Sequence, residues 1–149
     1  MKKILTIFSI VALLSSCYKE NEIIPDVLVS KGKIANIAVI WAGPTRPTTT
    51  LTVDAGTVVP VTLEFFSDEP IKEFKLYSRP ATTGTYVLFS TVAVSMASVV
   101  YDAKLRNSVV KFNVTAPAAK NATLQVAAEI ITTNELPSGQ RTVTIRTKA

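Results

Sequence analysis

Few side chains in this chain of 149 residues could perform catalysis. The sequence contains no histidine, which excludes a Ser-His-Asp triad, a Cys-His pair and a histidine metal site. It contains no glycine-rich loop of the kind that binds phosphate. Asp68 and Glu69 could supply the carboxylate pair of a glycoside hydrolase, but they are expected in a short polar turn with no apolar pocket evident around them. We therefore expect neither an enzymatic activity nor a cofactor.

Loop carboxylates could bind calcium, which takes roughly six to eight oxygen ligands. Asp54 and Asp68 are expected at opposite ends of one strand, about 30 Å apart, so they cannot share an ion. Asp68, Glu69 and Glu135 could converge if the turns that carry them are neighbours. These acids lack an Asp-x-Asp run, and we expect no metal site.

The only cysteine, Cys17, ends an N-terminal segment of three parts. Two lysines precede an apolar core, residues 4–14, and two serines follow that core. The core is about half as long as the roughly 20 residues that a membrane-spanning helix needs. The segment is therefore typical of a cleaved signal peptide, residues 1–16.

Residues 14–17, Leu-Ser-Ser-Cys, resemble the lipobox of bacterial lipoproteins. The resemblance implies cleavage before Cys17, lipid transfer to its sulfur and acylation of the new amino terminus. Several acyl chains would hold the mature protein in a membrane almost irreversibly, because each buried CH₂ contributes about 0.8 kcal/mol. An ordinary secretory signal with a chance cysteine is the alternative.

Residues 17–30 are expected to form the lipidated N-terminus and a flexible tether. A short charged stretch at 19–22 resembles the surface-export signals of Bacteroidota lipoproteins, and a plain solvated tether is the alternative. The resemblance implies an outer-membrane protein on the periplasmic face or at the cell surface. Loss of residues 1–16 lowers the net charge from +5 to +3 and leaves no Lys/Arg cluster, so nucleic acid is not an expected partner.

Residues 31–149 show a period-two alternation of apolar and polar side chains, which is typical of strands rather than helices. The segments that we expect to be strands are 34–41, 59–65, 74–77, 86–94, 110–114, 124–130 and 143–146. Residues 51–53 form a short extended piece. Residues 95–108 are ambiguous, since 99–101 could form a strand and 103–106 a helical turn. Pro60 lacks a backbone donor, so the start of its strand should lie at an edge or a bulge.

About seven short strands with turns between them predict a single antiparallel β-sandwich over residues 31–149. The alternation places Phe65, Phe74 and Phe112 on core-facing positions. The strand, acidic turn and strand at 61–78, with the final strand pair at 122–131 and 141–148, resemble immunoglobulin-like or fibronectin-type-III-like domains of bacterial surface proteins. The resemblance implies an immunoglobulin-like fold.

Two functions are compatible with such a protein. The first is a structural or adhesive module that acts by protein contact at the cell envelope. The second is a glycan-binding accessory subunit of an outer-membrane polysaccharide-uptake system, which the likeness to Bacteroidota lipoproteins would allow. An exposed aromatic platform would favour the second. The aromatic residues that could be exposed are Trp41, Tyr77, Tyr86 and Tyr101.

A sandwich of this order alternates its turns between two ends, which predicts a surface far from the tether. The turns at 54–57, 79–85 and 116–121 are expected at that distal end. They carry a polar, mildly basic set of residues, namely Arg79, Thr82, Thr83, Lys120 and Asn121. We hypothesise that these residues contact another component of the cell surface. Solvated turns without a partner are the alternative.

Overall fold

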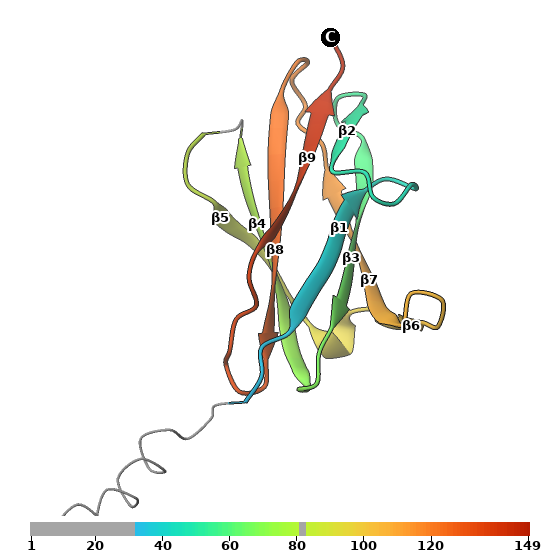
Figure 1. Ribbon diagram of the computed structural model, residues 1–149. Coiled ribbons are helices and arrows are strands. Elements are labelled where there is room, and N and C mark those ends of the chain that lie inside the picture. The colour runs from blue at the N-terminus through green and yellow to red at the C-terminus, as the bar shows by residue number, and fades with distance from the viewer. Residues whose placement is uncertain (1–31, 81–82) are drawn as a thin grey trace, which may run out of the picture. The chain divides into compact units, whose positions relative to one another are not determined.

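Figure 1 shows the computed structural model of the chain, which describes residues 32–80 and 83–149. Residues Gly32–Ala149 form one compact unit. The predictions for the signal peptide, Cys17, the tether and Thr82 fall outside the described residues. Among those residues, no helix is long and apolar enough to cross a membrane.

Nine strands and one short 3₁₀ helix make up the described part of the chain. They are β1 (Asn36–Ala42), β2 (Thr50–Val53), β3 (Val58–Phe66), β4 (Ile71–Pro80), β5 (Val87–Ala93), η2 (Val94–Met96), β6 (Val100–Asp102), β7 (Asn107–Thr115), β8 (Thr123–Thr132) and β9 (Arg141–Thr147). The strands form two sheets, ordered β1-β3-β7-β6 and β2-β9-β8-β4-β5, which pack face to face (Figure 1). This is the strand order of an immunoglobulin-like sandwich, and it confirms the predicted all-β fold class.

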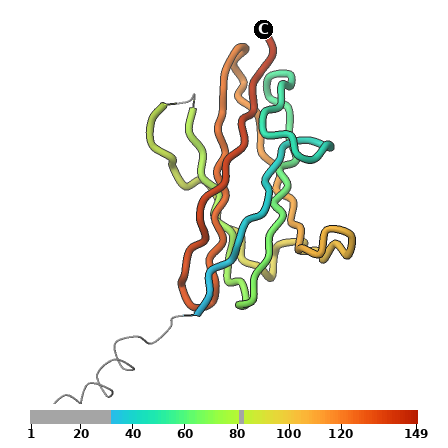
Figure 2. Tube along the Cα trace, viewed as in Figure 1, coloured from blue at the N-terminus to red at the C-terminus, as the bar shows by residue number. Residues whose placement is uncertain are grey.

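The chain changes sheets between β1 and β2 (Figure 2). Gly43 starts this crossing with a φ of 80°, a conformation that L side chains rarely adopt. Its amide donates to the carbonyl oxygen of Pro60 at 2.8 Å. The register of β1 with β3 ends at Ala42 opposite Val61, so Pro60 lies just past the last paired residue of β1. β3 is an interior strand without a bulge here, so the predicted edge position holds only in this local sense.

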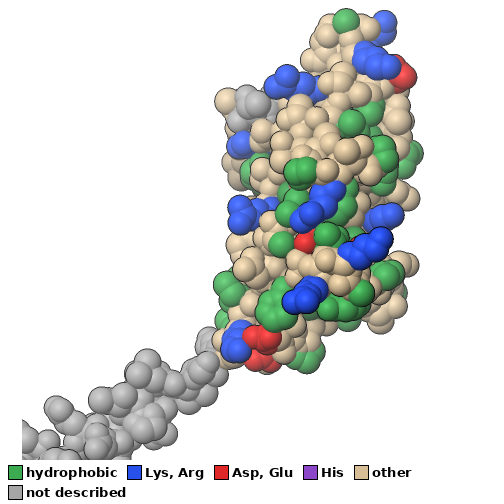
Figure 3. All heavy atoms as spheres, turned by 45° about the vertical axis from the view of Figure 1, so that its right-hand side comes forward, with side chains coloured by type: hydrophobic (Ala, Val, Ile, Leu, Met, Phe, Trp, Pro, Cys, Tyr) green, Lys and Arg blue, Asp and Glu red, His purple; other side chains and the backbone are tan. Residues whose placement is uncertain are grey.

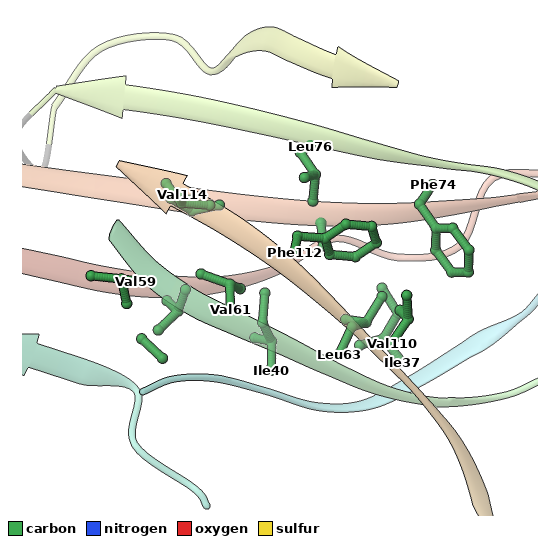
Figure 4. Packing of buried hydrophobic residues seen from close by; sticks show 14 of the residues in the cluster. Ile37, Ile40, Val59, Val61, Leu63, Phe74, Leu76, Val110, Phe112 and Val114 are labelled. Carbon is green, nitrogen blue, oxygen red and sulfur yellow. The ribbon is translucent and has the colours of Figure 1, made fainter. Parts of the chain in front are cut away.

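The core lies between the two sheets and follows the period-two alternation. Val59, Val61 and Leu63 of β3 are buried against the second sheet. Within the core, the Phe74 ring lies 5.6 Å from that of Phe65. It lies 5.5 Å from the ring of Phe112, and Figure 4 shows these two side chains. The predicted core positions of these three phenylalanines are confirmed.

The ambiguous segment 95–108 contains a 3₁₀ helix, a three-residue strand and a tight turn. The strand, β6, matches the expectation for residues 99–101 to within one residue. The turn at 103–106 is not helical, because it joins β6 to β7 as an antiparallel hairpin. Asp102 stabilises that turn, since its Oδ1 accepts from the amides of Lys104 and Leu105, and Arg106 takes a positive φ of 55°.

Candidate ligand-binding groove

Hydrogen bonds place four of the turns at two ends, as predicted. At one end, the Gly56 amide donates to the carbonyl oxygen of Pro117, so the 54–57 turn lies beside the β7–β8 loop. At the other end, the Thr133 amide donates to the carbonyl oxygen of Pro70, and Lys33, the second described residue, pairs with Asp68. The C-terminus lies at the first of these ends (Figure 1).

Arg79, the first residue of the expected distal surface, lies within β4 rather than in a turn. Its Nε donates to Gln125 Oε1 at 2.7 Å, and its Nη1 donates to the Gly84 carbonyl at 3.1 Å. Its guanidinium carbon lies 4.5 Å from the centre of the Tyr86 ring. Arg79 therefore ties the β4–β5 connection to β8 through two of its five N–H donors.

The other described members of the distal set are exposed residues on two separate loops. Thr83 lies between β4 and β5, and Lys120 and Asn121 lie between β7 and β8. The backbone amide of Asn121 donates to the Lys148 carbonyl oxygen at 3.1 Å. No side-chain hydrogen bond or ion pair joins these three residues within the described ranges, so they do not form a built site.

The acids that could have converged on calcium are each engaged elsewhere. Asp68 pairs with Lys33 at 2.7 Å, and Glu135 pairs with Lys72 at 2.5 Å. These contacts raise the pKa of both lysines, mainly through the hydrogen bond to the carboxylate. Glu69 Oε1 accepts from the amide of Lys33. In the described part of the chain, no three His, Cys, Asp or Glu side chains are grouped as metal ligands.

The outer face of the β1-β3-β7-β6 sheet differs from what the alternation implied. Thr62 and Glu64 point away from the core, yet each is only 2% exposed. Trp41 pairs with Thr62 across β1 and β3 and is 8% exposed. Side chains that strand periodicity assigns to solvent are therefore covered on this face.

Glu64 links two segments that border this face. Its Oε1 accepts from Asn107 Nδ2 at 2.6 Å, at the start of β7. Its Oε2 lies 2.8 Å from Nε of Arg46, which belongs to the β1–β2 loop. The Arg46 N–H is not directed at Oε2, which has no hydrogen-bond donor, so the contact is an ion pair without a hydrogen bond. Burying this carboxylate is costly, and Arg46 supplies the compensating charge.

Beside Glu64 the same face is hollowed into a groove of about 780 Å³. Its floor contains Trp41, Thr62, Val109 and Lys111 from β1, β3 and β7. The hairpin formed by β6 and the 103–106 turn supplies one wall, with Val100, Tyr101, Lys104 and Leu105. Figure 3 shows hydrophobic side chains intermixed with Lys and Arg side chains across this region. A groove of this volume is within the range of about 300–1,000 Å³ typical of ligand sites.

Two of the four candidate aromatic residues line the groove. Tyr101 is 65% exposed on its wall, and Trp41 lies in its floor. Tyr86 instead hydrogen bonds to Gln125, and Tyr77 hydrogen bonds to Glu129 on the outer face of the other sheet. Burial and the Glu129 carboxylate raise the pKa of Tyr77 to about 12, so this hydroxyl remains a donor at neutral pH.

Sequence reasoning identified these aromatic residues individually but missed the groove. The signal for the groove lies in the strand pairing. Trp41 is in register with Thr62, and Thr62 is in register with Lys111, so the three side chains lie in one row. Reading that row required the pairing of strands about 20 and 50 residues apart in sequence. The wall depends on a hairpin whose first strand is only three residues long.

The sequence matches no family model and no curated protein. The chain is similar to a number of solved structures at low sequence identity, three of which are as follows. Astrotactin-2, a vertebrate-specific, perforin-like membrane protein involved in neuronal development, is 13% identical with a TM-score of 0.55, over 76% of this chain and 22% of that one. A family 76 glycoside hydrolase from a bovine Bacteroides thetaiotaomicron strain is 12% identical with a TM-score of 0.44, over 75% of this chain and 20% of that one. A Niemann-Pick type C2 protein from the Japanese carpenter ant is 10% identical with a TM-score of 0.48, over 78% of this chain and 95% of that one.

This chain thus spans about a fifth of the length of astrotactin-2. At this level of identity, the similarity to astrotactin-2 is a similarity of β-sandwich fold.

Proposed function

We propose that this protein is a glycan-binding module, held at the cell envelope by lipid on Cys17, and that the groove beside Glu64 is its binding site. The observation that carries the proposal is that Tyr101, Trp41 and Thr62 line one concave surface, on which Tyr101 presents an exposed ring. The C–H face of a sugar ring stacks on an aromatic ring, and its hydroxyl groups need side-chain donors and acceptors. A groove that combines aromatic faces with a few polar groups is suited to such a ligand.

The exposed ring of Tyr101 provides the test of this site. We expect Tyr101→Ala to weaken glycan binding about tenfold or more, which corresponds to about 1.4 kcal/mol. Because the side chain is mostly exposed, its removal should leave the fold intact. The measurement is binding of the purified mature protein to an array of bacterial, plant and host glycans, followed by titration of the bound glycans.

Phe89→Ala is the matched control, because Phe89 is an exposed aromatic residue on β5, outside the groove. It should leave glycan affinity unchanged. Equal affinities for wild type and Tyr101→Ala would contradict the assignment of the groove. Failure of wild type to bind any glycan on the array would contradict the proposed function itself.

Membrane attachment through Cys17 has a separate test. Cys17→Ala should leave the unprocessed precursor and abolish labelling by a fatty-acid probe, because the acylated sulfur is absent. Labelling and cell fractionation of both forms provide the measurement. Survival of the label in Cys17→Ala would show that the lipobox resemblance is misleading.

A protein-interaction module is the second candidate, and the edge strand β5 is the observation that favours it. Among the described strands β5 pairs with β4 alone, and it exposes Val87, Leu88 and Phe89. An uncharged edge strand can add a strand from another protein. Under this function Phe89→Ala would weaken binding to an envelope protein, and Tyr101→Ala would have no effect.

A further inference from the structure

We propose that the groove selects acidic glycans, meaning oligosaccharides whose sugar rings carry carboxylate groups. This inference rests on the proposed function and adds the chemical class of its ligand.

The cations of the groove have no partners within the described residues. Lys104 and Lys111 both line the groove, and the side chain of neither forms an ion pair or a hydrogen bond there. Both residues are exposed. Their ammonium groups are therefore available to a ligand in solution.

The anions near the groove are already engaged. Asp102, the acid in its lining, accepts the amides of Lys104 and Leu105 through Oδ1. Glu64, on the neighbouring part of the same face, is buried and is matched by Arg46. Backbone amides are neutral, so Asp102 keeps its negative charge. The groove lining therefore carries two lysines against one aspartate, a net positive charge that is complementary to an anionic ligand.

The spacing of the two lysines favours a ligand longer than one sugar. Lys111 is in register with Thr62 in the groove floor. Lys104 lies in the turn between β6 and β7, and the last register pair before that turn is Asp102 with Asn107. Asn107 and Lys111 are four residues apart on β7, which corresponds to about 13 Å along a strand. The two lysines therefore start from different parts of the groove, Lys111 from the floor and Lys104 from the hairpin whose wall also carries Tyr101.

The floor favours a sugar over an acidic peptide. Peptides that bind sheets gain affinity from main-chain hydrogen bonds to an open strand edge. Thr62 pairs with Trp41 on one side and Lys111 on the other, so the backbone of β3 is already paired on both sides. The edge strand β6 offers only three residues. Recognition must therefore come from side chains, by stacking, hydroxyl contacts and charge.

The test compares two probes with the same skeleton and different charge. Oligogalacturonate of about six units carries a carboxylate on every ring, and its methyl ester carries none. We expect the full mature lipoprotein, in a non-ionic detergent, to bind the acid at least tenfold more tightly than the ester. Added salt should weaken binding of the acid selectively, because the interaction is between exposed charges. Isothermal titration calorimetry measures both affinities.

Variants then assign the preference to the two lysines. Lys104→Gln and Lys111→Gln should each lower affinity for the acid about fivefold or more and leave affinity for the ester unchanged. Arg146→Gln, which removes an exposed cation on β9 outside the groove lining, should change neither. A second acidic oligosaccharide, oligoalginate, is titrated in parallel, and a preference for either acid that depends on these lysines supports the inference.

The remaining outcomes overturn the inference or the function on which it rests. Equal or tighter binding of neutral glycans would exclude selection of acidic ligands and would leave a glycan-binding function standing. Binding of hexaglutamate at the same two lysines, as tight as that of the acidic glycans, would show an acidic-peptide site instead. Absence of binding to every glycan, acidic or neutral, would remove the proposed function and the inference together.

Discussion

Phe74→Ala is expected to lower the free energy of unfolding by about 3–5 kcal/mol, because truncation of a buried phenylalanine leaves a large cavity. Phe74 is 1% exposed. Its ring packs edge-on against Phe65 with centroids 5.6 Å apart and lies 5.5 Å from the ring of Phe112. The substitution removes two aromatic contacts together with the buried area. Chemical denaturation followed by near-ultraviolet circular dichroism measures the loss.

The size of this effect matters because the sandwich has no disulfide to support it. Cys17 is the only cysteine in the chain. Typical domains are stable by only about 5–15 kcal/mol, so the loss would approach the whole stability of a marginal domain. Phe89→Ala on the neighbouring strand β5 is the control and should cost under about 1 kcal/mol, because Phe89 is exposed. Similar losses in the two variants would be incompatible with the core described above.

Arg46→Ala is expected to destabilise the protein by about 2–4 kcal/mol, although Arg46 itself is partly exposed. The reason is that the substitution leaves the buried carboxylate of Glu64 without its cationic partner. Glu64 is buried, and without Arg46 its only described partner is the Nδ2 group of Asn107. Leaving one member of a buried ion pair without its partner costs more than the pair itself contributes.

A double-mutant cycle separates this cause from lost packing of the arginine stem. In a Glu64→Gln background, Arg46→Ala should cost less than about 1 kcal/mol, because no buried charge is then left uncompensated. Lys33→Ala is the surface comparison, since its ion pair with Asp68 is exposed and should contribute at most about 1 kcal/mol. If the losses of stability in Arg46→Ala and Glu64→Gln simply add in the double variant, the two side chains are not coupled. The ion pair would then not explain the loss in Arg46→Ala.

Strand periodicity predicted the parts of the fold that depend on one buried face. Val59, Val61 and Leu63 alternate in sequence, and all three are buried in the core. The two additional strands, β2 and β6, are four and three residues long, too short for a periodic signal of their own. β2 corresponds to the short extended piece expected at 51–53. β6 corresponds to the strand that was one possibility for 99–101.

The same periodicity could not predict what covers the outer face. It assigns Thr62 and Glu64 to solvent, and their burial depends on Arg46 from one loop and on the hairpin that leads to Asn107. Likewise, the turn chemistry around Pro80 placed Arg79 in a loop, whereas pairing with Gln125 on β8 keeps it in a strand. In each case the deciding contact joins residues far apart in sequence, and no local pattern encodes such contacts.

Ligand is expected to bind in the groove on the β1-β3-β7-β6 sheet, and an NMR titration tests this claim. Trp41 is the only tryptophan, so the ¹⁵N-labelled protein gives one indole N–H signal from the groove floor. Titration with the tightest glycan from the array should shift that signal and the amides of Thr62, Tyr101 and Lys111. Shifts confined to the distal loops, residues 83–86 and 116–122, with the Trp41 indole unmoved, would contradict the claim.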